Sequence, residues 1–216
     1  MENNYYQNKK GYKINKFRRN AILKLLGKRN LVLDVGCGEG FLGEEIKKKT
    51  SAVVYGIDVA ESVVDLAKNK LDEVFCSDIE KNIDSWPENI KTKKFDIIIV
   101  SEVLEHLFYP EKLLDDLRKV LKKDGEIIIT VPNILFWKNR IKILFGIFDY
   151  KESGLMDRGH IHFFTWQSLK KMLGQGNFTI VEIKNHVPTR YTKFFGCCFP
   201  GMFAYQFIIK VKLNED

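Results

Sequence analysis

The sequence predicts an α/β fold in which a mostly parallel sheet carries helices on both faces. Short apolar runs alternate along the chain with segments of helical periodicity, at short and regular spacing. Most of these runs are continuously apolar, which indicates strands that are buried on both faces. A chain of 216 residues can bury a full core, and 45% apolar with 29% charged residues is ordinary for a globular protein. We therefore expect residues 1–216 to form a single domain.

The first expected element is a helix over Asn15–Leu26, because apolar side chains recur there at helical spacing and Gly27 supplies a stop signal. Strands and helices then alternate. The expected order is strand Leu31–Val35, helix Phe41–Lys49, strand Ala52–Ile57, helix Glu61–Lys70, strand Glu73–Cys76, strand Phe95–Val100, helix Glu111–Lys122 and strand Glu126–Val131. A helix over Thr165–Leu173 precedes two last strands, Phe178–Ile183 and Phe203–Lys212, which can pair antiparallel.

Basic residues gather at the start of the chain. Residues 1–30 carry nine Lys/Arg and one acid, whereas the remaining residues hold 26 bases and 27 acids. The excess positive charge of the chain, +7 in total, therefore lies in its first 30 residues. This N-terminal helical segment is either a solvated helix face or a surface that attracts an anionic substrate or a membrane.

The cysteines and the termini favour a cytoplasmic protein. Cys37, Cys76, Cys197 and Cys198 show no C-x-x-C spacing, so we expect buried, reduced thiols and a reducing compartment. The N-terminus has no apolar run typical of a secretory signal, and the longest uncharged stretch, Phe194–Ile209, is shorter than the roughly 20 residues that a membrane span needs.

A glycine loop joins the first expected strand to the first helix of the alternating part. Its glycines, Gly36, Gly38 and Gly40, permit a tight turn and close approach of a ligand to the backbone. Nucleotide-like ligands bind at such carboxyl ends of parallel strands. Phe41 stands where a dinucleotide fingerprint has its last glycine, and Asp34 would repel a pyrophosphate. The loop therefore favours a ligand with cationic groups.

Two further acids follow the next two strands. Asp58 ends the second strand and is suited to accept hydrogen bonds from ribose hydroxyls. Asp78 follows the third strand, where it can reach an adenine amino group while Ile79 packs on the ring. Each acid alone could be a helix N-cap. Acids at three successive strand ends favour a shared ligand instead.

This constellation resembles the class I S-adenosylmethionine-dependent methyltransferases over residues 31–133, including the stretch Ser101–Leu107 after the fourth strand. The resemblance implies a Rossmann-like sheet of seven strands, mostly parallel with an antiparallel last strand, and S-adenosylmethionine as cofactor. It implies that the loop with Asp34 holds the amino-acid end of the cofactor. The implied cofactor-binding residues are Asp34, Gly36, Cys37, Gly38, Gly40, Asp58, Val59, Asp78, Ile79, Ser101 and Glu102.

A narrower resemblance concerns the acceptor. Residues 139–150 and 154–165 are similar to a bacterial subgroup that is often linked to cell-envelope glycans and secondary metabolites. This resemblance implies O-methylation of a small molecule or an envelope sugar, and it leaves N- and C-methylation open.

Two histidines are the candidate catalytic residues. A hydroxyl acceptor must lose its proton as it attacks, and His106 and His160 are expected beside the transferred methyl group. Either one could instead make a structural hydrogen bond. His162 alternates with His160, so on an extended segment only one of them faces the cleft. The set His160-x-His162 with Asp157 lacks typical metal-ligand spacing, and we expect no metal.

Residues 134–164 interrupt the connection after the fifth strand with apolar, aromatic and basic side chains. We expect this insertion to cover the acceptor pocket. It could be a substrate lid, a peripheral membrane contact or a core helix. Tyr5 and Tyr6 lie in a segment that the resemblance places over the cofactor.

Two other functions fit parts of the sequence. A nucleic-acid methyltransferase would suit the basic N-terminus, but Ser101–Leu104 replaces the Asn/Asp-Pro-Pro-aromatic motif of DNA amino-methylating enzymes, and no RNA-binding module is recognisable. A non-catalytic cofactor-binding protein would keep the glycine loop without a working acceptor pocket.

Overall fold

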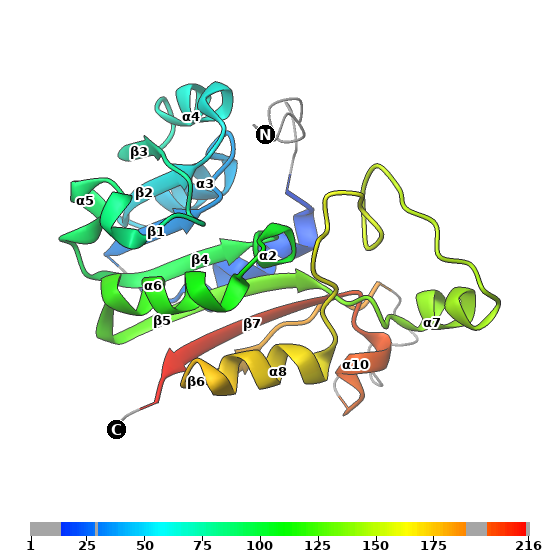
Figure 1. Cartoon of the computed structure of the whole chain (residues 1–216). Coiled ribbons are helices and arrows are strands. Elements are labelled where there is room, and N and C mark those ends of the chain that lie inside the picture. The colour runs from blue at the N-terminus through cyan, green and yellow to red at the C-terminus, as the bar shows by residue number, and fades with distance from the viewer. Residues whose placement is uncertain (1–13, 29, 189–197, 215–216) are drawn as a thin grey trace.

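A computed structural model of the chain describes residues 14–28, 30–188 and 198–214 (Figure 1). Seven strands form one sheet in the order β3-β2-β1-β4-β5-β7-β6. Neighbours among β1 to β5 pair in parallel, whereas β7 runs antiparallel to both β5 and β6. The predicted fold class is confirmed. The strands are β1 (Leu31–Val35), β2 (Val53–Asp58), β3 (Glu73–Cys76), β4 (Phe95–Ser101), β5 (Leu121–Pro132), β6 (Phe178–Ile183) and β7 (Gln206–Leu213).

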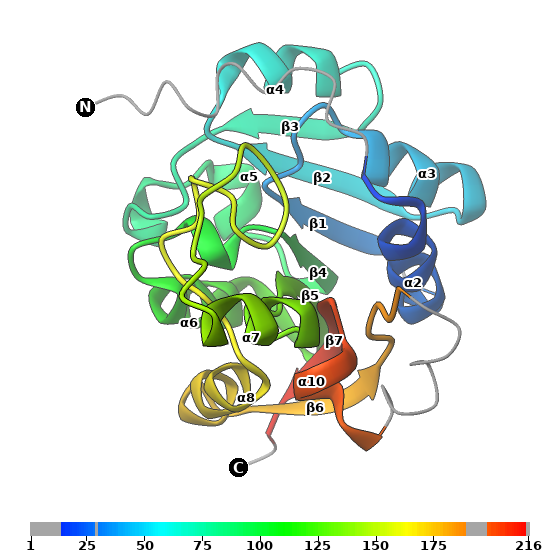
Figure 2. The same ribbon diagram turned by 90° about the vertical axis from the view of Figure 1, so that its right-hand side faces the viewer.

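Helices cover both faces of the sheet (Figure 2). They are α2 (Lys16–Leu26), α3 (Phe41–Lys49), α4 (Glu61–Ala67), α5 (Glu88–Lys91), α6 (Pro110–Val120), α7 (Trp137–Leu144), α8 (Trp166–Gln175) and α10 (Pro200–Phe203), with 3₁₀ turns η1 (Ile83–Ser85) and η2 (Leu104–His106). Alternate residues of β4 point to opposite faces, as a pleated strand requires. Ile97 and Ile99 pack with α2 and α3, whereas Ile98 and Val100 pack with α5, α6 and α8.

The expected helices and strands all form, with ends that move by a few residues. One boundary was wrong. The last strand was expected to begin at Phe203, but Phe203 is the end of helix α10 (Pro200–Phe203), and β7 begins at Gln206. The fifth strand also begins earlier than expected. Leu121 already pairs with Phe95, and a register shift between Phe95 and Ile97 accommodates the residues between Leu121 and Glu126. Two thiols depart from the expected burial, because Cys76 and Cys198 are exposed.

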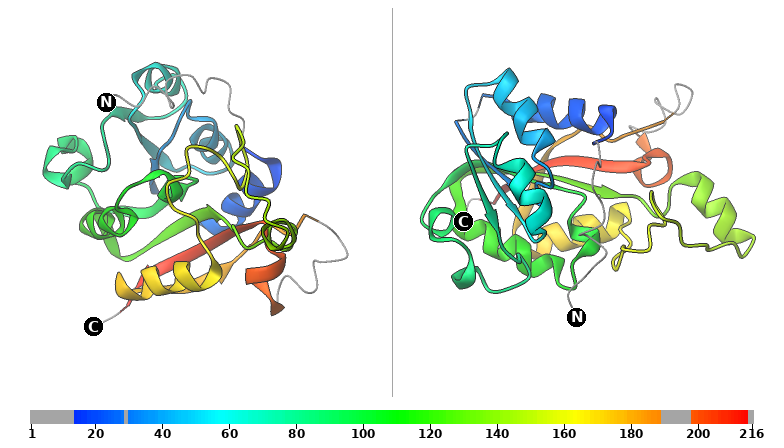
Figure 3. Two further views of the ribbon diagram at one scale, coloured as in Figure 1. Left: turned by 45° about the vertical axis from the view of Figure 1, so that its right-hand side comes forward. Right: turned by 90° about the horizontal axis from the view of Figure 1, so that it is seen from above.

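The insertion that follows β5 divides into two parts. Helix α7 stands away from the sheet (Figure 3), and none of its residues is buried. The core-helix interpretation of this segment is therefore wrong. Leu155, Met156 and Phe164 are buried, so the later part of the insertion returns to the body of the protein. Within the described part of the chain, no helix is both long and apolar enough to cross a membrane.

The basic segment is not simply a solvated face. The N-cap of α2 is Asn15, whose side chain accepts a hydrogen bond from the backbone of Phe17. Ile22, Leu25 and other apolar side chains of α2 enter the core. Arg18 is also buried, at 3% exposure, which requires a partner for its charge. Tyr5 and Tyr6 lie outside the described residues.

Candidate active site at the carboxyl edge of the sheet

The glycine loop follows β1 directly and has a backbone that glycine alone adopts easily. Gly36, Gly38 and Gly40 have φ of 69°, 51° and 77°. A Cβ at Gly36 would lie 2.6 Å from Cγ2 of Val103, so the loop lies against the segment that follows β4. The backbone amide of Gly36 donates to the carbonyl of Ile57 at 2.8 Å, which fixes the loop beside the end of β2.

Asp58 closes this loop from the end of β2. One carboxylate oxygen accepts from the backbone amide of Gly38 at 2.8 Å, and the other accepts from that of Ala60 at 3.0 Å. Each carboxylate oxygen can accept more than one hydrogen bond. The position therefore suits an acid that both holds the loop and accepts hydroxyl groups from a ligand. Val59, the next residue, is exposed.

Asp34 lies in the interior of the sheet edge and is 2% exposed. Its Oδ2 atom has no hydrogen-bond partner among the residues that the structure describes. Burial, with a smaller contribution from the charge of Asp58, raises the pKa of Asp34 to about 7. A cationic ligand group beside this carboxylate would offset the cost of its burial, so Asp34 fits the expected ligand.

The remaining residues of this half of the site differ in exposure. Asp78 accepts the backbone amide of Glu80 at 3.0 Å in a turn after β3, and Ile79 belongs to the apolar core. The Cys37 thiol lies 3.7 Å from the carbonyl of Gly38. Burial, together with the charges of Asp34 and Asp58, raises the pKa of this thiol, so Cys37 is a packed residue and not a nucleophile.

Glu102 begins the segment after β4 with a strained backbone, because its φ is 58°. Its carboxylate accepts from Arg18 at 2.9 Å and from Nε2 of Gln206 at 2.5 Å. Its backbone amide donates to the carbonyl of Thr130 at 3.0 Å, and the Ser101 hydroxyl lies 3.2 Å from the Thr130 hydroxyl. Burial raises the pKa of Glu102 and Arg18 opposes the rise. Glu102 is thus a junction of α2, β4, β5 and β7.

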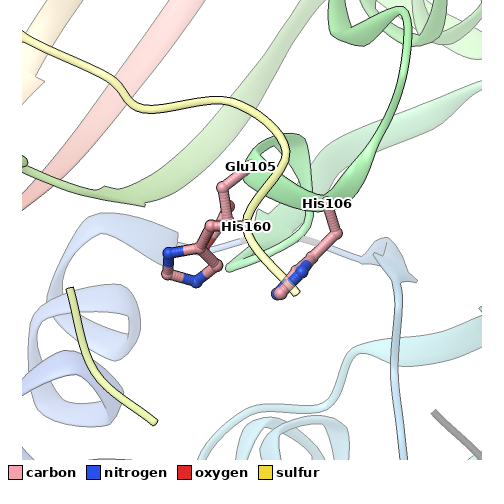
Figure 4. A group of neighbouring side chains, drawn as sticks. All are labelled: Glu105, His106 and His160. Atoms are coloured by element: carbon pink, nitrogen blue, oxygen red, sulfur yellow. The ribbon is translucent and has the colours of Figure 1, made fainter. Parts of the chain in front are cut away.

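The two predicted histidines come together, with an acid that the sequence analysis did not select. Glu105, His106 and His160 converge where η2 meets the returning part of the insertion (Figure 4). The two imidazole rings have centroids 4.9 Å apart and cross at 63°. Amides of Ile161 and His162 donate to the backbone carbonyl of Glu105 at 2.8 and 3.0 Å, which holds the two segments together.

Glu105 is fully buried, and neither oxygen of its carboxylate has a hydrogen-bond partner within residues 14–28, 30–188 and 198–214. Burial, then the nearby charge of Glu102, raises the pKa of Glu105 well above its usual range. A sequence signal for it existed, because Glu105 and His106 are adjacent in a stretch that is otherwise apolar. Its burial beside His160 could not be predicted from the sequence, because 54 residues lie between the two in the chain.

The other two described histidines do not join this group. Nε2 of His162 lies 3.1 Å from the carbonyl of Phe108. His186 stacks on Phe17 with ring centroids 4.4 Å apart, and burial lowers its pKa. His160 is therefore separated from His162, although only one residue lies between them.

A glycine loop after β1, acids at the ends of β1 to β3 and an antiparallel seventh strand define the class I methyltransferase arrangement. The chain belongs to the methyltransferase family described as "Methyltransferase domain", which matches residues 6–183. The cofactor of this family is S-adenosylmethionine.

Solved structures agree on the fold. A methyltransferase from Archaeoglobus fulgidus is 22% identical, with a TM-score of 0.64, over 91% of this chain and 96% of that one. Magnesium protoporphyrin IX methyltransferase from Synechocystis was solved with bound S-adenosylhomocysteine. It is 18% identical, with a TM-score of 0.64, over 91% of this chain and 82% of that one.

Curated relatives include a ubiquinone biosynthesis O-methyltransferase from Coxiella burnetii, 36% identical over 47% of this chain and 43% of that protein. The mitochondrial protein of the same name from Bos taurus is 32% identical over 59% of this chain and 35% of its own length. The match thus spans about half the length, or less, of these relatives.

The raised pKa of Asp34 predicts a pH-dependent cost to the ligand-free fold. Because the folded pKa of about 7 exceeds the model-compound value of 3.8, Asp34 binds more protons folded than unfolded between these values. Its contribution to stability therefore falls as pH rises from about 4 to 7. The variant Asp34→Asn should gain stability over the unmodified protein, on the order of 1–4 kcal/mol more at pH 8 than at pH 5.

Urea unfolding of both proteins at several pH values measures this difference. Other buried acids titrate in both proteins, so the difference between the two isolates Asp34. A difference that stays constant between pH 5 and 8 would show that Asp34 is ionised throughout.

Proposed function

We propose that the chain transfers a methyl group from S-adenosylmethionine to a hydroxyl oxygen of a small molecule. The observation that carries the proposal is the contact between the glycine loop and the segment after β4, at Gly36 and Val103. It brings the residues expected to hold the cofactor next to Glu105, His106 and His160. A cofactor-binding half and an acid–histidine half at one sheet edge suit group transfer between two ligands.

Cofactor binding would divide among the strand ends. Asp34 would face cationic groups of the amino-acid end, and the amides of the glycine loop would approach it closely. Asp58 would accept the ribose hydroxyls, and Asp78 with Ile79 would hold the adenine. Ser101 and Glu102 would line the methionine side, with Glu102 acting mainly to set the backbone. When bound, S-adenosylmethionine supplies an electrophilic methyl group on a sulfonium sulfur that leaves as a neutral thioether.

The acceptor side would position and deprotonate a hydroxyl group. His106 lies in η2 and His160 in the returning part of the insertion, and either imidazole would orient the acceptor or take its proton. The curated relatives named as O-methyltransferases support a hydroxyl acceptor. An envelope sugar would present the same chemistry as a phenol or another small alcohol.

Helix α7 and the residues after it support a second part of the proposal, a peripheral contact with an anionic bilayer. Cations in α7 are followed here by a run of exposed apolar side chains. The apolar ones are Ile141, Ile143, Leu144, Phe145, Ile147 and Phe148, and the cations are Lys138, Arg140 and Lys142. Such a contact would suit an acceptor that is itself apolar.

The cofactor assignment predicts the effect of Asp58→Ala. Loss of the carboxylate leaves the ribose hydroxyls without an acceptor, so the affinity for S-adenosylhomocysteine should fall about 10- to 100-fold, as calorimetry measures. Asp65→Ala, at an exposed acid on α4 paired with Lys68, is the matched control and should bind normally. If the unmodified protein binds neither S-adenosylmethionine nor S-adenosylhomocysteine, the proposal fails.

The acceptor assignment predicts the effect of His106→Ala and His160→Ala. A positioned histidine typically contributes about 10²–10⁴-fold, so the more important one should lower turnover by that factor and spare cofactor affinity. Turnover is measured with whichever member of a panel of phenols and sugars the unmodified protein methylates. His162→Ala serves as the control in the same segment. Near-full activity of the double variant would overturn the assignment.

The membrane contact predicts sedimentation with phosphatidylglycerol vesicles and weaker sedimentation with phosphatidylcholine vesicles. The double variant Leu144→Ser, Phe145→Ser removes the two most exposed apolar side chains of this segment and should reduce sedimentation several-fold. Leu66→Ser, at an exposed leucine on α4, should not. Equal loss in both variants, or no sedimentation of the unmodified protein, contradicts the contact.

A further inference from the structure

Three side chains with metal-ligating atoms meet beside the proposed acceptor position. One donor atom from each of Glu105, His106 and His160 lies within 4.8 Å of the others, although the residues come from η2 and a loop some 50 positions later. Figure 4 shows the three side chains converging. Exposed donor atoms often lie this close by chance, but in this group Glu105 is fully buried.

The carboxylate of Glu105 is the first such observation. It is fully buried, and both of its oxygens lack a hydrogen-bond partner in the described part of the chain. A buried carboxylate without partners costs several kcal/mol unless a cation or a proton compensates it. One of its oxygens lies within 4.8 Å of a ring nitrogen of each of the two histidines, which favours a cation held between the three groups.

The contacts of the two histidines with backbone carbonyls are the second observation. Nδ1 of His106 donates to the carbonyl of Gly159 at 2.8 Å, and Nδ1 of His160 lies 3.4 Å from the carbonyl of Leu155. Because a carbonyl can only accept, each Nδ1 carries the proton and the lone pair of the neutral ring lies on Nε2. A backbone carbonyl on one ring nitrogen is the usual support of a histidine that binds metal through the other.

Local charge is the third observation. Among the described residues, Glu102 and Asp157 are the acids whose charges act on Glu105, and the cation that acts on it, Arg18, is paired with Glu102 at 2.9 Å. Asp157 accepts the amide of Gly159 at 2.8 Å and so shapes the turn that presents His160. The surroundings of Glu105 therefore favour added positive charge.

We propose that Glu105, His106 and His160 bind one divalent transition-metal ion. Two imidazoles with one carboxylate suit Mn²⁺, Fe²⁺, Co²⁺, Ni²⁺ or Zn²⁺ better than Mg²⁺ or Ca²⁺, which prefer oxygen ligands. Three protein ligands leave coordination positions open, as in catalytic metal sites. This set differs from the weakly supported His160, His162 and Asp157, since Nε2 of His162 is directed to the carbonyl of Phe108.

The ion deepens the proposed function, on which this part of the inference rests. An acceptor hydroxyl that occupies an open position would have a lower pKa and would release its proton to solvent. The acceptor oxygen then forms a bond to the methyl carbon as the carbon–sulfur bond breaks, and the electron pair of that bond stays on sulfur. The two histidines would act through the ion by positioning the acceptor oxygen, and neither would need to take its proton.

Metal binding is tested without turnover. Protein treated with a chelator and dialysed is titrated with Mn²⁺, followed by electron paramagnetic resonance, and with Zn²⁺ against a chromophoric chelator. We expect one ion per chain. Removal of a supporting group typically costs 10- to 100-fold in metal affinity, so Glu105→Gln and His160→Ala, which remove ligands, should each weaken binding at least about 100-fold. His162→Ala, the matched control from the same segment, should bind as the unmodified protein does.

S-adenosylhomocysteine binding, measured on the same samples, separates the possible failures and reports whether each variant folds. If the unmodified protein binds S-adenosylhomocysteine but neither metal, the metal site is overturned and the methyltransferase proposal stands. If it binds neither S-adenosylhomocysteine nor S-adenosylmethionine, the methyltransferase proposal fails on its own test. Metal binding that survives Glu105→Gln, or that His162→Ala weakens equally, also overturns the site.

Discussion

Asp34, Glu102 and Glu105 bring three carboxyl groups to one edge of the sheet, where Asp34 and Glu105 are buried and the side chain of Glu102 is 22% exposed. The parallel topology is the cause, because the carboxyl ends of β1 and β4 meet at this edge and each is followed by a loop. Burying a carboxylate is unfavourable unless a cation or several donors compensate it. The protein itself compensates Glu102, through Arg18 and Gln206. Compensation of the other two by ligand cations would account for the positive charge of the cofactor and for the proposed metal ion.

The junction at Glu102 transmits this constraint to the rest of the site. Its left-handed backbone turns the chain sharply after β4, and contacts with Thr130, Arg18 and Gln206 hold that strained turn. The turn places Val103 against Gly36 and directs η2 toward the returning insertion. Without the ion pair from α2, an uncompensated charge would remain at the centre of the edge. The basic N-terminal helix therefore has a structural role in addition to any attraction of anions.

Local patterns sufficed to predict the sheet and the position of Asp34 and Asp58 at its carboxyl edge. The strands around Asp34 and Asp58 are apolar runs bounded by glycine or an acid, and such signals need no knowledge of distant residues. The ion pair of Arg18 with Glu102 and the position of Glu105 beside His160 could not be predicted in this way. Both depend on how segments 50 to 100 residues apart pack together. The burial of helix α7 could not be predicted from its own residues either. Its composition fits a core helix as well as a surface one, and only the tertiary structure shows that none of it is buried.

Proton linkage tests most directly the claim that bound cations compensate buried carboxylates at this edge. S-adenosylmethionine binding is measured calorimetrically at pH 7 in buffers of different ionisation enthalpy, for the unmodified protein and for Asp34→Asn. A cation beside Asp34 lowers its pKa from about 7, so the unmodified protein should release more protons on binding than the variant, in which residue 34 cannot ionise. Equal proton release by the two proteins would contradict the claim.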